Sequence, residues 1–95
     1  MTNDELAALA AAHAPHSVAL QARAQAVQAS GALQADAAQP PASPCIGVCQ
    51  LDASRRYCTG CLRDLPELQA WGRADAAQQR AIWASVLQRA AHVAQ

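Results

Sequence analysis

The stretch CIGVCQLDASRRYCTGC, from Cys45 to Cys61, contains all four cysteines of the chain. Its spacing, C-x3-C-x8-C-x2-C, places them in two close pairs, Cys45/Cys49 and Cys58/Cys61, on either side of a short loop. Two such pairs can fold back on each other and present four sulfur atoms tetrahedrally to one metal ion or cluster. We therefore expect these four cysteines to be the ligands of one metal centre that stabilises a small fold.

Disulfides or free thiols are the alternatives to metal binding. The first residues, MTNDELAALAAAHAP, lack the basic region of a secretory signal, so we expect a cytoplasmic protein. A reducing compartment favours metal binding over structural disulfides, and it leaves free or redox-switching thiols open. A thiol–disulfide active site at Cys58 and Cys61 is disfavoured, because the strand-to-helix context of a thioredoxin-like motif is missing.

Ligand type does not choose between a zinc ion and an iron–sulfur cluster, since both accept four thiolates, and both stay open. Four thiolates saturate a tetrahedral ion and leave no position for a reactive water, so we do not expect an enzyme. Arg55, Arg56 and Arg63 lie close enough in sequence to offset the thiolate charge, with solvent exposure as the alternative. Gly47 and Gly60 lie inside the two pairs, where a tight turn can require a positive φ.

Residues 1–42 are rich in Ala and Gln, and fifteen of the first forty residues are alanine. A capping box at Thr2 and Glu5 predicts a helix over residues 3–13, and a second helical stretch spans residues 17–29. Leu20, Val27 and Leu33 make a thin apolar stripe, and an isolated helix of this length is marginal in water. We therefore expect a partly helical or disordered tail that docks weakly or not at all.

The segment QADAAQPPASP, residues 34–44, contains three prolines and predicts a linker between this tail and an organised domain at residues 43–93. His13 and His16 flank Pro15 in the tail, far along the chain from the cysteines. We expect both to be ordinary surface histidines.

Helical signals follow the cysteine loop. Asp64 with Glu67, and Asp75 with Gln78, have the spacing of a capping pair and predict two helix starts. Gly72 lies between them and is expected to end the first helix in a left-handed conformation. The predicted fold class is therefore mostly α: a four-cysteine knuckle loop followed by an antiparallel helix pair.

Large apolar residues are few from Cys45 onward, and the chain contains no Phe. Trp71 and Trp83 are expected either in this thin core or on a surface that faces a partner protein. A structural metal contributes roughly 10–16 kcal/mol in zinc-finger peptides, enough to decide whether such a small domain folds.

Composition disfavours several classes of partner. Seven basic residues balance seven acidic ones, so the chain has no net charge to attract nucleic acid or an anionic membrane. No apolar run reaches the roughly 18 residues that a membrane span needs. Neither a phosphate-binding loop nor a nucleophile with an adjacent base is visible, so a small-molecule substrate is not expected.

The segments SPCIGVCQLD (Ser43–Asp52) and YCTGCLR (Tyr57–Arg63), followed by Glu67, Trp71 and QQRAIW, resemble the YdhL-like family of small bacterial proteins. This family is catalogued as a domain of unknown function and commonly labelled a predicted Fe–S protein. The resemblance covers roughly residues 43–90.

The resemblance implies that the four cysteines are metal ligands, and that Arg63, Glu67 and Trp71 are characteristic positions without an assigned role. The chain departs from the family pattern at Arg56, where glycine is frequent, and at Asp64, where a hydroxyl residue is usual. Arg56 lies in the loop and Asp64 at the helix cap, so neither departure changes a cysteine.

Three functions are compatible with these observations. The first is an interaction module in which the metal is structural and the helices contact a protein partner. The second is an iron–sulfur protein that transfers electrons or senses redox state beside an oxidoreductase. The third is a module that binds metal reversibly for handling or sensing.

Overall fold

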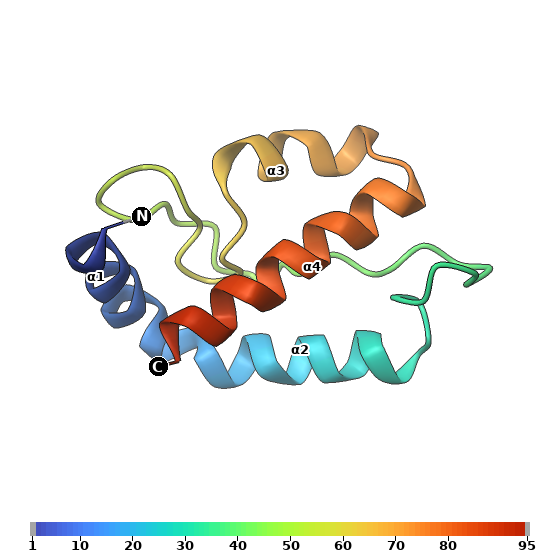
Figure 1. Ribbon diagram of the computed structural model, residues 1–95, viewed down its shortest axis with the longest axis horizontal. Coiled ribbons are helices and arrows are strands. Elements are labelled where there is room, and N and C mark those ends of the chain that lie inside the picture. The colour runs from blue at the N-terminus through green and yellow to red at the C-terminus, as the bar shows by residue number, and fades with distance from the viewer. Residues whose placement is uncertain (1, 95) are drawn as a thin grey trace.

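The computed structural model describes residues 2–94, and within this range regular structure is helical, with β-pairing limited to isolated bridges (Figure 1). The elements in chain order are α1 (Asn3–His13), η1 (Ala14–His16), α2 (Ser17–Ala29), α3 (Leu65–Ala70), η2 (Trp71–Arg73) and α4 (Ala76–Val93), where η denotes a 3-10 turn. The cysteine loop lies between α2 and α3. The expectation of a mostly α fold is confirmed, and the antiparallel packing of α3 on α4 stays a prediction.

Local capping explains where the helices begin. Helix α1 starts after Thr2, whose hydroxyl accepts a hydrogen bond from the Glu5 backbone N–H at 3.1 Å, as the sequence predicts. Asp64 and Glu67 form the equivalent reciprocal pair at α3, and α4 begins after Asp75 in the same way. A satisfied N-terminal N–H stabilises a helix by about 1 kcal/mol, so these starts follow from a few neighbouring residues.

Two glycines behave differently at the helix ends. Gly31 has a φ of +79° just beyond α2, which is the left-handed conformation that glycine favours. Gly72 does not adopt it, so the expectation of a left-handed stop there is wrong. Helix α3 tightens instead into η2, and the Ala74 backbone N–H bonds to the Trp71 carbonyl at 3.2 Å.

The N-terminal helices are part of the core. Leu9 from α1 and Leu20 and Val27 from α2 are buried in one cluster with Trp83 and Val86 from α4. Figure 1 shows α1 beside the C-terminal end of α4, and α2 extending along one side of it. The predicted helices over residues 3–13 and 17–29 are confirmed by α1 and α2, whereas the expectation of weak or absent docking is wrong. The physical reason is that the apolar side chains of α1 and α2 meet those of α4 in this cluster, so neither helix is isolated in water.

The segment after α2 lacks regular structure, yet side chains of the helices hold its backbone in place. Arg80 donates to the carbonyl of Ala32 at 2.9 Å and to that of Ala37 at 3.1 Å. The Trp83 indole N–H donates to the Ala42 carbonyl at 2.7 Å, and Pro44 is fully buried. The predicted linker thus lacks regular structure, and hydrogen bonds from Arg80 and Trp83 hold it against α4. Whether residues 43–93 form a domain that folds by itself stays a prediction.

Trp83 is completely buried, so it cannot belong to a surface that faces a partner. Its position is the first of the two that the sequence leaves open, the core. Trp71 is half-buried. Within residues 2–94, no helix combines the length and the apolar character needed to cross a membrane.

Candidate metal centre

The cysteine loop folds as a small hairpin-like turn. The Asp52 N–H donates to the Tyr57 carbonyl, and the Thr59 N–H donates to the Gln50 carbonyl, both at 2.8 Å. An antiparallel bridge joins Leu51 to Cys58. These bonds bring the end of the first cysteine pair against the start of the second.

Asp52 organises the tip of this turn. Its Oδ1 accepts the backbone N–H groups of Arg56 and Tyr57 at 3.0 and 3.2 Å, and Ser54 donates its hydroxyl to the same carboxylate. Partial burial acts to raise the pKa of Asp52, but the hydrogen bonds from Ser54 and the two backbone N–H groups outweigh it and lower the pKa. Arg55 takes a φ of +59° to close the turn.

The second pair of cysteines is built into the core. Cys58 and Cys61 are 3% and 1% exposed, and Leu62, which follows them, is fully buried with a φ of +62°. The Cys58 Sγ lies 3.1 Å from the Val48 carbonyl. This second pair is therefore held by tertiary packing as well as by the turn.

The first pair lies nearer the surface. Cys45 is half-buried and Cys49 is exposed. The Gly47 N–H donates to the Cys45 Sγ at 3.4 Å, and Gly47 has the positive φ, +86°, that the sequence indicates for a tight turn. A hydrogen bond with the Cys45 thiol, together with its charge, raises the pKa of Cys49. The two thiols of this pair are thus close neighbours.

Hydrogen bonding shifts the pKa values of the two buried thiols in opposite directions. The Cys61 thiol donates to the Cys58 sulfur, and the backbone N–H groups of Cys61 and Gly60 support it, so the pKa of Cys58 is lowered. The same bond with Cys58 raises the pKa of Cys61, and burial raises it further.

The donor chemistry fits a soft metal: four thiols stand in two near pairs, and the Cys58 sulfur lies 3.1 Å from the carbonyl of Val48, which precedes Cys49. The geometry is less complete. Within residues 2–94, no group of three or more Cys, His, Asp or Glu side chains is arranged to hold a metal ion. The structure thus has two cysteine pairs on one loop, and their joint ligation of one metal stays a prediction.

The three arginines of the loop have different surroundings. Arg63 is 6% exposed, donates its Nε–H to the Cys61 Sγ at 3.2 Å, and stacks its guanidinium 5.5 Å from the Trp71 ring centroid. Arg55 and Arg56 are exposed, and Arg56 pairs with Glu5 at 3.6 Å. Arg63 is thus the arginine placed to offset charge on a cysteine sulfur, whereas Arg55 and Arg56 have the solvent exposure that the sequence leaves as the alternative.

His13 contacts the cysteine loop, which its sequence context does not indicate. The expectation of a surface residue is wrong, because His13 is 3% exposed and its Nδ1 lies 2.7 Å from the carbonyl oxygen of Thr59. Thr59 lies between the two buried cysteines, so α1 holds the Cys58–Cys61 turn directly. A histidine in an alanine-rich helix carries no signal of a partner that is 46 positions away.

Arg89 on α4 also contacts the end of the cysteine loop, and the sequence does not indicate this either. It donates to the Leu62 carbonyl at 3.0 Å and pairs with Glu67 and Asp64, which also cap α3. One side chain thereby ties the end of the cysteine loop and the start of α3 to α4. Its position on a polar helix face gives it the appearance of a solvated residue in the sequence.

Gly60 provides a direct test of the turn. A Cβ at this position would lie 2.8 Å from both the Cβ and the carbonyl oxygen of Val48, so Gly60→Ala should lower the free energy of unfolding by about 1–3 kcal/mol. Gly72→Ala is the matched control, since a Cβ there meets nothing within 4 Å. It should be neutral or stabilising by up to about 1 kcal/mol. Urea unfolding of both variants measures this; equal stabilities would contradict the close contact.

A family model described as "Protein of unknown function (DUF1289)" matches residues 43–90. The match contains the whole cysteine loop, α3 and most of α4, and it leaves α1 and α2 outside. No curated protein and no solved structure matches the chain. The family match agrees with the resemblance to the YdhL-like group. Because it spans just over half of the chain and includes all four cysteines, the chain belongs to the DUF1289 family.

Proposed function

We propose that this protein binds one metal centre through Cys45, Cys49, Cys58 and Cys61. The observation that carries the proposal is the pairing of the four thiols on one loop, with the buried pair packed into the core. The Gly47 N–H and the Arg63 Nε–H both point at cysteine sulfurs, and such bonds stabilise thiolates around a metal.

Closure around a metal requires the first pair to approach the second. Cys49 is exposed and Cys45 only half-buried, so this approach disturbs little of the core. Cys58 and Cys61 stay where packing places them, with Arg63 beside them. In this proposal the metal completes a site that the chain has half assembled.

The metal is either a zinc ion or an iron–sulfur cluster. Packing of Cys58, Cys61 and Leu62 in the same cluster as Trp83 supports a structural role, in which the metal fastens the loop to the helices. The Arg63 bond to the Cys61 sulfur supports the second candidate, a cluster that transfers electrons or senses redox state, because hydrogen bonds to sulfur tune reduction potentials. Reversible metal handling is a third reading, favoured by the exposure of Cys49.

We further propose a binding role in place of catalysis, with a protein as the partner. Four thiolates leave a tetrahedral ion no open position for substrate. Trp71 is half-buried beside Arg63, so it is the tryptophan that remains available to a partner surface near the loop.

Purification under anaerobic conditions, with elemental analysis and an absorbance spectrum, tests this function. We expect stoichiometric metal: zinc in a colourless protein, or iron with sulfide and broad visible absorption. Serine substitution at Cys58 or Cys61 should abolish the metal content. Ala53→Ser, an exposed change in the same loop, is the control and should retain it. Protein that contains no stoichiometric metal, even after reconstitution, contradicts the proposal.

A further inference from the structure

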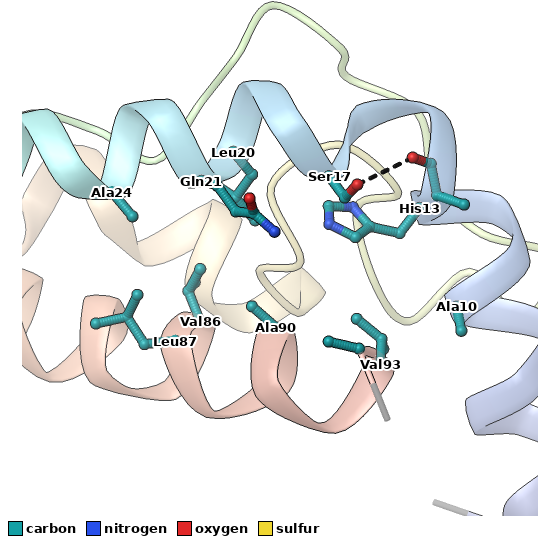
Figure 2. A pocket seen from close by; sticks show the side chains of 12 residues that line it. Ala10, His13, Ser17, Leu20, Gln21, Ala24, Val86, Leu87, Ala90 and Val93 are labelled. Carbon is teal, nitrogen blue, oxygen red and sulfur yellow. Dashed lines mark hydrogen bonds between the residues drawn. The ribbon is translucent and has the colours of Figure 1, made fainter.

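A cavity of about 230 Å³ lies between the N-terminal helices and α4, away from the exposed cysteine pair. Figure 2 shows side chains from α1 and α2 on one side of it and from α4 on the other. The space exists because alanines face each other across it, among them Ala10, Ala24 and Ala90. Leu20 and Val86 form its buried apolar walls. For scale, benzene occupies a cavity of about 150 Å³, so one substituted ring fits here.

The polar groups of the cavity come from one short stretch of chain, where His13, Ser17 and Gln21 line it. The Ser17 hydroxyl already donates to the Ala14 carbonyl at 3.1 Å. Among the described residues that line the cavity, none is Asp, Glu, Lys or Arg. Such a lining suits a neutral molecule with an apolar body and a polar group at one end.

His13 defines which polar group is favoured. Its Nδ1 faces the Thr59 carbonyl, which can only accept, so Nδ1 carries a proton, and the acceptor of the ring in its neutral form is Nε2. Figure 2 shows this ring beside Ser17 at the polar end of the cavity. A hydroxyl or N–H group of a ligand could donate to Nε2 there. We propose that this cavity is a binding site for a small neutral molecule with an apolar body and one hydrogen-bond donor, such as a phenol.

The proposal extends beyond metal binding and does not depend on it. It does connect the two sites, because the ring that would meet the ligand also bonds to Thr59, between Cys58 and Cys61.

Titration of the full-length protein with para-cresol, followed by amide NMR shifts, tests the site. We expect saturable shifts at Ala24 and Ala90, and weaker binding of toluene and 4-methylbenzoate. Ala90→Leu fills the cavity and should weaken cresol binding about tenfold or more, as changes of one or a few methylenes do in apolar pockets. Ala91→Leu is its matched control, because Ala91 is exposed on the same helix, and it should bind as the natural protein does.

His13→Asn separates the donor preference from the cavity itself. The asparagine amide can still donate to Thr59 but offers no group at the Nε2 position, so cresol should lose its advantage of about two- to tenfold over toluene. Three results would overturn the proposal: no saturable shift with any probe, equal binding by Ala90→Leu and Ala91→Leu, or equal binding of the charged benzoate.

Discussion

Replacing Trp83 with alanine is expected to lower the free energy of unfolding by about 3–5 kcal/mol, which is typical of a large side chain removed from a packed core. Trp83 is completely buried in the cluster that joins α4 to the N-terminal helices. The change also leaves the Ala42 carbonyl without its 2.7 Å donor. Urea unfolding monitored by far-UV circular dichroism measures the effect.

Two further variants separate the contributions. Trp83→Phe keeps most of the ring and loses the indole N–H, so its main cost should be about 0.5–1.5 kcal/mol for the lost hydrogen bond. Trp71→Ala removes the same side chain from a half-buried position beside Arg63 and should cost less than Trp83→Ala. A Trp83→Ala variant as stable as Trp71→Ala would contradict the central position of Trp83 in the core.

Removal of the proposed metal with a chelator is expected to have the other large effect. A structural zinc contributes roughly 10–16 kcal/mol in zinc-finger peptides, so its loss should unfold the cysteine loop. The helices should loosen as well, because Cys58, Cys61 and Leu62 share a cluster with Trp83. We expect the near-UV signal of Tyr57 and the tryptophans to change and the far-UV helical signal to fall.

The control is a variant that cannot hold the metal. Cys61→Ser should resemble the chelated protein from the start and should not respond further to chelator. Far-UV and near-UV spectra that stay unchanged after complete metal removal would refute a structural role, even if metal is present in the purified protein.

The starts of three helices follow from short-range chemistry, which is why the sequence predicts them. The side chains of Thr2, Asp64 and Asp75 each accept a hydrogen bond from the backbone N–H three residues later. The side chain of that later residue, a Glu or Gln, accepts the backbone N–H of the capping residue in return. Such pairs need no distant residue, so their spacing alone is sufficient. The same local reasoning is right for Gly47, which has a positive φ, and wrong for Gly60, which does not. Gly60 lacks room for a side chain instead, because a Cβ there would lie 2.8 Å from Val48.

The docking of the N-terminal helices could not be predicted in this way. The apolar residues of these helices look too few to drive docking. The local sequence shows only those residues, and it does not show the apolar surface that a distant helix offers to them. Leu9, Leu20 and Val27 are buried because they pack in one cluster with Trp83 and Val86 of α4. His13 and Arg89 illustrate the same limit, since each bonds to the cysteine region from a distant part of the chain.

By itself, the sequence determined the helix starts, the tight turn at Gly47 and the presence of two cysteine pairs on one loop, because each depends on residues a few positions apart. Only the tertiary structure decided that Trp83 is buried, that the N-terminal segment belongs to the core, and that Arg63 is the arginine bonded to a cysteine sulfur. These outcomes depend on which surfaces remain uncovered once the helices pack. Sequence spacing does not carry that information.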